Sequence, residues 1–266
     1  MRIALGIEYL GTRYCGWQSQ ANGCGIQDLV EAALSTIAEH RVQVHCAGRT
    51  DSGVHAWEQV MHFNSDVSRP LSAWVRGTNA NLPNDIAVSW ACPVGAEFHA
   101  RFSARSRHYR YILLNRPQRP AIGVGRVGWY HQPLDVEEMR RAAQCFVGSN
   151  DFSAFRSSEC QAKSPIKSMH SFTIEQQGDY VIFDLHADGF LHHMVRNLVG
   201  SLLYVGSGRG DIDWIKTLLE QRDRRLAAPT FMPDGLYLTG IEYDYGWGLP
   251  QRSLLSKQKL IAEMLL

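Results

Sequence analysis

The sequence predicts an α+β fold: two ferredoxin-like (βαββαβ) halves forming one broad, mostly antiparallel sheet, with helices on one face and a basic cleft on the other. Segments with an apolar residue at every second position, typical of strands, are separated by segments in which apolar residues recur every three or four positions, typical of amphipathic helices. The same order of elements occurs twice. A chain of 266 residues that is 45% hydrophobic is long and apolar enough to bury such a core.

The first half is expected to contain a strand, a helix, two strands, a helix and a strand. Alternating apolar residues predict a half-buried strand over 2–10, and repeated glycines predict a loop over 11–25. Apolar residues at spacings of three and four predict an amphipathic helix over 26–40. The remaining elements of this half are strands at 42–46 and 57–64, a short helix at 71–79 and a strand at 86–90.

The second half repeats this order from residue 107 onward. Its elements are a strand at 107–114, a helix at 136–146, strands at 168–176 and 179–187, helices at 189–205 and 211–221, and a last strand at 236–243.

The repeat divides the chain into domains. We expect residues 1–104 to form the N-terminal half, 105–246 the C-terminal half and 247–266 a less regular tail. The apolar residues of this tail are compatible with a short terminal helix or with a contact to a partner. These boundaries place the chemically notable Asp51 in the first half.

The N-terminus and the cysteines bear on the compartment of the protein. Glu8 interrupts the apolar N-terminal run and no small-residue cleavage site follows, so neither a signal peptide nor a membrane span is expected. We therefore expect a cytoplasmic protein. The cysteines form no C-x-x-C pair and match no zinc spacing, which predicts reduced structural thiols. They are Cys15, Cys24, Cys46, Cys92, Cys145 and Cys160.

Basic residues gather in one window, although the net charge of the whole chain is only +1. The window is residues 101–126; it contains no aspartate or glutamate, and Phe102, His108, Tyr109 and Tyr111 lie among its arginines. Arginines interleaved with aromatic residues suit the binding of a phosphate backbone and exposed bases. The alternative is a solvated basic face, which the absence of acids makes weaker. The arginines are Arg101, Arg105, Arg107, Arg110, Arg116, Arg119 and Arg126.

An acid in a glycine-flanked turn is the first candidate for chemistry. Asp51 follows a predicted strand in the run Gly48-Arg49-Thr50-Asp51-Ser52-Gly53-Val54-His55-Ala56. Glycines allow a sharp turn that directs the carboxylate outward, and Arg49 lies close enough in sequence to pair with it. A carboxylate held in this way suits covalent catalysis. The alternative is a turn aspartate that bonds to its own backbone, and these residues alone favour that alternative.

Two further patterns favour structural interpretations. His192 and His193 would point to different faces of one helix, so they are not expected to share a metal ion, and core packing or RNA contact is favoured. The glycine-rich run 206–210 lacks a following Lys-Ser or Lys-Thr and comes after a helix, which favours a helix stop over a phosphate-binding loop.

The run around Asp51 resembles the signature of the tRNA pseudouridine synthase I (TruA-type) family, and other blocks that resemble this family follow in order over about the first 240 residues. They are Tyr14–Gln18, Phe98–Ala104 with Tyr109–Tyr111, Asp151–Arg156 with Phe190–Asn197, and Ala227–Pro229 with Gly235–Leu238.

The resemblance implies a homodimer that converts uridine to pseudouridine at positions 38, 39 and 40 in the anticodon stem-loop of tRNA. It implies roles for the matching residues: Asp51 as nucleophile, Arg196 as its ion-pair partner, Arg49 beside it handling the target base, Tyr109 stacking on that base, and Leu236 or Leu238 against the uracil.

The chemistry that the resemblance implies sets the remaining expectations. Tyr109 is also a candidate for the base that removes the C5 proton. The reaction is neither redox nor dependent on a Lewis acid, so no metal or organic cofactor is expected. We expect Arg101, Arg105, Arg107 and Arg110 to contact the RNA backbone. Two alternatives are a non-catalytic tRNA-binding chaperone on the same scaffold and a nucleoside hydrolase that uses Asp51.

Overall fold

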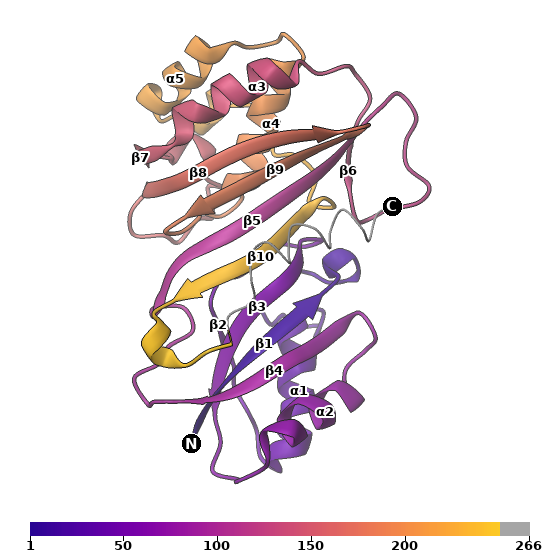
Figure 1. Cartoon of the computed structure of the whole chain (residues 1–266), viewed down its shortest axis with the longest axis vertical. Helices are drawn as coiled ribbons and strands as arrows, with labels where there is room; N and C mark the ends of the chain where they lie inside the picture. The colour runs from indigo at the N-terminus through magenta and orange to yellow at the C-terminus, as the bar shows by residue number, and fades with distance from the viewer. Residues whose placement is uncertain (251–266) are drawn as a thin grey trace. The chain divides into compact units, whose positions relative to one another are not determined.

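The computed structural model describes residues 1–250, which form two compact units (Figure 1). Of the described residues, the first unit comprises Met1–Arg105 and 238–250, and the second comprises Ser106–Tyr237. The expected terminal helix or partner contact falls mainly on residues 251–266, which lie outside the described residues. The domain boundaries given above stay a prediction.

In the first unit, β1 (Arg2–Tyr9) lies between β3 (His55–Asn64) and β4 (Ile86–Val94) and pairs antiparallel with both. The short β2 (His45–Cys46) pairs antiparallel with β3. The last strand, β10 (Leu236–Tyr243), begins in the second unit and continues into the first.

β1 is buried on both of its faces. Ile3 and Leu5 are fully buried on one face, and Ala4 on the other face packs in a cluster with Val60 and Phe98. The expectation of a half-buried strand is therefore wrong for β1. Phe98, which is remote in the sequence, covers the face of β1 that the alternation of apolar residues predicts to be exposed.

The helices of the first unit are α1 (Ile26–Ala38) and α2 (Leu71–Ala80), which pack against each other, and α2 also packs on β4. The absence of a side chain at Gly77 permits this close approach, because a Cβ there would lie 2.7 Å from the Cδ1 of Ile37. Trp74 of α2 is fully buried.

In the second unit, β5 (Ala104–Asn115), β9 (Tyr180–Ala187), β8 (Ile166–Gln177) and β7 (Gly148–Asp151) pair antiparallel in that order. The short β6 (Gly128–Tyr130) pairs parallel with β5.

The helices of the second unit are α3 (Val136–Ala143), α4 (Met194–Gly206) and α5 (Ile212–Gln221). Helix α3 packs on β8 and on both α4 and α5. Short 3-10 turns complete the described residues: η1 (Gly11–Arg13), η2 (Gln144–Phe146), η3 (Ser153–Phe155), η4 (Arg224–Leu226) and η5 (Tyr245–Trp247).

The predicted class, α+β with a large and mostly antiparallel sheet, is confirmed. The helix predicted over 189–205 begins later, at Met194, because His193 adopts a left-handed conformation with a φ of 63°. The same helix ends at Gly206, which confirms the helix stop. No helix among residues 1–250 is long and apolar enough to cross a membrane.

The expectation that all the cysteines are reduced is wrong for one pair. Cys15 and Cys24 form a disulfide within the loop between β1 and α1, while Cys46, Cys92, Cys145 and Cys160 are free thiols. The spacing matches no common motif, so the sequence carried no local signal for this pair.

Candidate active site

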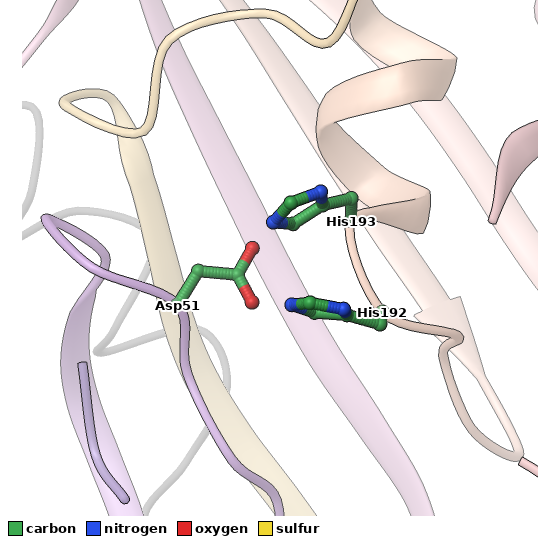
Figure 2. Close-up of side chains that lie close together, drawn as sticks. All are labelled: Asp51, His192 and His193. Atoms are coloured by element: carbon green, nitrogen blue, oxygen red, sulfur yellow. The ribbon is translucent and has the colours of Figure 1, made fainter. Parts of the chain in front are cut away.

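Asp51 lies in the loop that connects β2 to β3 in the first unit. The N–H of Val54 donates to the backbone oxygen of Asp51 at 3.1 Å, and Gly53 has a φ of 80°, a conformation that favours glycine. Figure 2 shows the Asp51 carboxylate pointing away from the backbone of its own loop. The turn therefore presents the carboxylate outward, in place of the bond to its own backbone that the residues alone favoured.

Side chains from β1 and β3 fix the start of this loop. The Gln59 amide donates to the Gly48 backbone oxygen at 2.6 Å, and its oxygen accepts from the Gly48 N–H at 3.4 Å. The hydroxyl groups of Tyr9 and Thr50 are hydrogen-bonded at 2.8 Å. Gln59, Tyr9 and Thr50 are all buried, so water does not compete for these bonds.

The backbone of the Tyr14–Gln18 segment braces the rest of the loop. The Trp17 N–H donates to the Thr50 oxygen at 3.0 Å, and the Ser52 hydroxyl donates to the Tyr14 oxygen at 3.1 Å. Gly16 has a φ of 90°, and a Cβ there would lie 2.7 Å from the Thr50 oxygen and 3.0 Å from the Asp51 carbonyl carbon. Only glycine permits this approach. Gly16 belongs to the Tyr14–Gln18 block that carries the family resemblance, but no local pattern indicated its position against the Asp51 loop.

The brace is itself anchored to the first unit. The hydroxyl of Tyr14 is hydrogen-bonded to Asp85, and burial together with this carboxylate raises the pKa of Tyr14, which keeps the phenol protonated as a donor. At the far end of the loop, the Gly11 N–H donates to His55 Nδ1 at 2.9 Å. The loop that carries Asp51 is thus held from both flanks.

Arg49 and Arg101 of the first unit both act electrostatically on Cys46. Burial raises the pKa of the Cys46 thiol to about 12, against the opposing effect of the Arg49 and Arg101 guanidinium groups. Arg49 lies two residues before Asp51 in its loop, and Arg101 is exposed. Two of the predicted site arginines therefore lie in the neighbourhood of Cys46, and Arg49 is part of the loop that carries Asp51.

Tyr109, Arg196 and Leu236 belong to the second unit. Tyr109 lies on β5, is 9% exposed, and meets the Phe190 ring edge-on at 4.9 Å. The Arg196 Nε on α4 donates to the Phe231 oxygen at 2.8 Å. Leu236 and Leu238 are both buried at the start of β10. The predicted ion pair between Arg196 and Asp51 joins residues of different units and stays a prediction.

Asn197 ties three of the sequence blocks together behind Arg196. It is fully buried; its amide donates to the Phe155 oxygen at 2.8 Å, and its oxygen accepts from the Thr230 hydroxyl at 2.7 Å and from an Arg224 nitrogen at 3.0 Å. Phe155 lies in the Asp151–Arg156 block, and Arg224 and Thr230 flank the Ala227–Pro229 block. Asn197 thereby positions the first turn of α4, a role that no local pattern indicated.

The arginine window is compensated by acids from elsewhere in the chain. Arg110 is 6% exposed and forms a two-pronged ion pair with Asp184, with N–O distances of 2.7 Å for both bonds. Arg105 pairs with Asp244, and Arg116 lies 4.0 Å from Asp179. Arg110 therefore has a structural role, while its predicted RNA contact stays a prediction. The inference from absent acids is corrected, because acids from other parts of the chain pair with the window.

The expected backbone-contacting arginines differ in their surroundings. Arg101 and Arg105 are exposed. Arg107 is half-buried and donates to the Asp188 oxygen at 2.9 Å. Their contact with RNA stays a prediction.

The sequence predicted that His192 and His193 lie on one helix. In the structure both residues directly precede α4. Their rings lie 4.0 Å apart at an angle of 38° (Figure 2). The positive φ of His193 turns the backbone so that adjacent side chains face each other. The argument that they must point to different faces is therefore wrong.

His62 makes the stability of the first unit depend on pH. It is buried, and its Nδ1 accepts from the Ala100 N–H at 3.1 Å. Burial, followed by the charges of His99, Arg2 and His45, lowers the pKa of His62 to about 3. The unfolded chain binds this proton near pH 6.5, so stability is full above that pH and falls as the pH drops from 6.5 toward 3.

The His62→Asn variant is therefore expected to lose less free energy of unfolding than the wild type between about pH 7 and pH 5. Urea denaturation at both pH values measures the difference. The matched His40→Asn variant should show the wild-type change in free energy of unfolding between these pH values. The same change in His62→Asn would contradict the assignment of the pH dependence to His62.

Comparisons with known proteins point to one family. A family model described as tRNA pseudouridine synthase matches residues 6–103 and 142–244. Three similar relatives are each named tRNA pseudouridine synthase A. The protein of Dechloromonas aromatica is 59% identical over 94% of this chain and 95% of its own length. That of Janthinobacterium sp. (strain Marseille) is 57% identical over 94% of each chain. That of Chromobacterium violaceum is 57% identical over 98% of this chain and 100% of its own length.

Proposed function

The chain belongs to the tRNA pseudouridine synthase family, and from this premise we propose that it converts uridine to pseudouridine at positions 38, 39 and 40 of the tRNA anticodon stem-loop, with Asp51 as the nucleophile. As a member of this family it is an isomerase. The observation that carries the proposal is the Asp51 loop, which fixes a projecting carboxylate through buried hydrogen bonds on one flank and a glycine-dependent backbone brace on the other.

The reaction requires the uracil to be detached, turned and rejoined. The Asp51 carboxylate attacks the ribose at C1′ as the N1–C1′ bond breaks, which holds the sugar covalently. The uracil turns, C5 bonds to C1′, and the carboxylate leaves. C5 then loses its proton and N1 gains one, so the product is an isomer of the substrate. A rigid loop favours this sequence because the nucleophile must stay aligned while the base moves.

Other residues would hold the base and balance charge. Arg196 is proposed to pair with the Asp51 carboxylate and Arg49 to handle the target base. Tyr109 would stack on the uracil, worth roughly 1–3 kcal/mol, and is a candidate for the base at C5. Leu236 or Leu238 would close the apolar side of the pocket. These groups would keep the detached uracil from diffusing away.

A base in the stem-loop must leave its stack before it can react, at a cost of a few kcal/mol. Contacts from exposed arginines to phosphates would offset this cost. Arg101 and Arg105 fit this role because both are exposed, whereas Arg110 is buried in its pair with Asp184. The expected homodimer stays a prediction, for which sedimentation equilibrium is the measurement.

The experiment is tritium release from tRNA labelled at C5 of uridine, with chromatography of the products. The proposal expects tritium release matched by pseudouridine in the RNA. Free uracil would indicate a nucleoside hydrolase, and tRNA binding with neither product would indicate a non-catalytic chaperone; either outcome contradicts the proposal.

Replacing Gly16 by alanine tests the brace. The added Cβ would meet the Thr50 oxygen at 2.7 Å and strain a backbone with a φ of 90°, so we expect a loss of about 1–3 kcal/mol of stability and a fall of about 10- to 100-fold in turnover as Asp51 is displaced. Thermal unfolding and tritium release measure the two effects.

Gly23→Ala is the matched control for this variant. Gly23 also has a positive φ, of 70°, but a Cβ there would meet nothing within 4 Å. It should lose some stability and keep its turnover. Equal turnover in the two variants would show that the brace does not position Asp51.

A further inference from the structure

The Cys15–Cys24 disulfide lies within the brace of the catalytic loop. Cys15 stands between Tyr14, whose backbone oxygen accepts from the Ser52 hydroxyl, and Gly16, where a Cβ would be too close to the backbone of Thr50 and Asp51. The bond closes a loop with a sequence separation of 9, and Gly25 after it is the N-cap of α1. A covalent tie at this point therefore acts on the backbone that holds Asp51.

The two cysteines are held side by side by backbone bonds that do not depend on sulfur. The Cys15 N–H donates to the Cys24 oxygen at 3.0 Å, and the Ile26 N–H donates to the Gly16 oxygen at 3.1 Å. Their Cα atoms are 5.4 Å apart, within the range that a disulfide spans. Two reduced thiols in this backbone would already be neighbours, so closing the bond requires little movement.

Cys15 differs from the other five cysteines, which are all half-buried, in being exposed. Cys15 is exposed and Cys24 is half-buried, so small oxidants and reductants can reach them. Burial raises the pKa of Cys46, Cys92 and Cys145, which lowers the fraction of reactive thiolate at those positions. The pair in the brace combines an exposed cysteine with a second cysteine whose Cα lies 5.4 Å away, which suits closure of an intramolecular disulfide.

We propose that Cys15 and Cys24 are a reversible oxidation site, at which formation of the disulfide stiffens the Tyr14–Gln18 brace and so holds the Asp51 loop in its working position. The effect on turnover rests on the proposed function; the formation of the bond and the stiffening of the two segments do not.

The chemistry needs a low-molecular-weight disulfide, such as oxidised glutathione. The Cys15 thiolate attacks one of its sulfurs, forms a mixed disulfide and releases one thiolate. The Cys24 thiolate then attacks the Cys15 sulfur, forms the Cys15–Cys24 bond and releases the second thiolate. The protein loses two electrons and two protons, and the small disulfide is reduced to two thiols. Excess small thiol reverses both steps.

Reduction should loosen the brace and, through it, the catalytic loop. Without the covalent tie, residues 15–24 open more often, and the hydrogen bonds from Trp17 and Ser52 break with each opening. We expect amide exchange in residues 11–25 and 48–54 to speed up by about three- to tenfold on reduction. Turnover of tRNA should fall by a similar factor.

The test treats the full-length protein with oxidised glutathione or with dithiothreitol. Peptide mass spectrometry after alkylation reports the Cys15–Cys24 bond, hydrogen exchange reports the two segments, and tritium release reports turnover. Support requires the cross-linked peptide in the oxidised sample alone, slower exchange in both segments and faster turnover. Absence of the cross-link, or equal exchange in the two samples, overturns the proposal.

The Cys15→Ser/Cys24→Ser variant is the control, since it keeps the free cysteines. Its exchange and turnover should match the reduced wild type and should not respond to oxidant. A response in this variant would assign the effect to another cysteine and overturn the proposal. If no sample makes pseudouridine, the proposed function fails, while cross-linking and exchange still decide whether the disulfide stiffens the loop.

Discussion

Replacing Asp51 by asparagine is expected to reduce pseudouridine formation about 1,000-fold or more. The amide keeps the size of the side chain but cannot act as the nucleophile. The turn bond from Val54 uses the backbone oxygen of residue 51, so the loop should keep its shape. Tritium release under single-turnover conditions measures the effect, and thermal unfolding should show a melting temperature close to that of the wild type.

Asp66→Asn is the matched control for Asp51→Asn. Asp66 is an exposed aspartate of the same unit, in the segment that follows β3, and its substitution removes the same charge. It should keep wild-type turnover. Retention of more than a tenth of the activity by Asp51→Asn would contradict the assignment of the nucleophile.

The second large effect is expected on stability, from replacing Asp184 by asparagine. The Arg110 side chain is 7% exposed, and Asp184 holds it through two bonds from the neighbouring strand. Removing the carboxylate takes the two-pronged partner away from a buried guanidinium, a change that costs about 3 kcal/mol or more. The melting temperature should fall by roughly 6–12 °C. Urea denaturation and calorimetry measure the loss.

An exposed pair of the same kind serves as the control. The side chains of Arg105 and Asp244 are 67% and 51% exposed, so Asp244→Asn should cost less than about 1 kcal/mol. Equal melting temperatures for Asp184→Asn and the wild type would contradict the structural role of the buried pair. Below its melting temperature, Asp184→Asn should bind tRNA as the wild type does.

The period of apolar residues predicted most elements, because burial of one face is recorded locally in the sequence. The start of α4 was missed because the left-handed conformation of His193 has no signature in residue type. The burial of both faces of β1 was missed because Phe98, which covers one of them, is remote in sequence. Local patterns indicate which face of a segment is apolar, but not which remote residues cover its other face.

The candidate site shows the same division. Asp51 and its turn were predictable from glycine spacing and the family resemblance. The pairing of Arg110 with Asp184 depends on the register of β5 with β9, in which these residues face each other, and no composition of one window reports a register. The contact of Gly16 with the Asp51 loop and the Cys15–Cys24 bond likewise arise from the folded path of the loop between β1 and α1.

The central claim is that Asp51 forms pseudouridine at defined positions of the anticodon stem-loop. Position-resolved mapping of pseudouridine, by carbodiimide modification and primer extension on tRNAs with uridine at 38, 39 or 40, tests it most directly. We expect stops at these three positions after treatment with the wild type and none after treatment with Asp51→Asn. Stops elsewhere in the tRNA, or the same stops with Asp51→Asn, would contradict it.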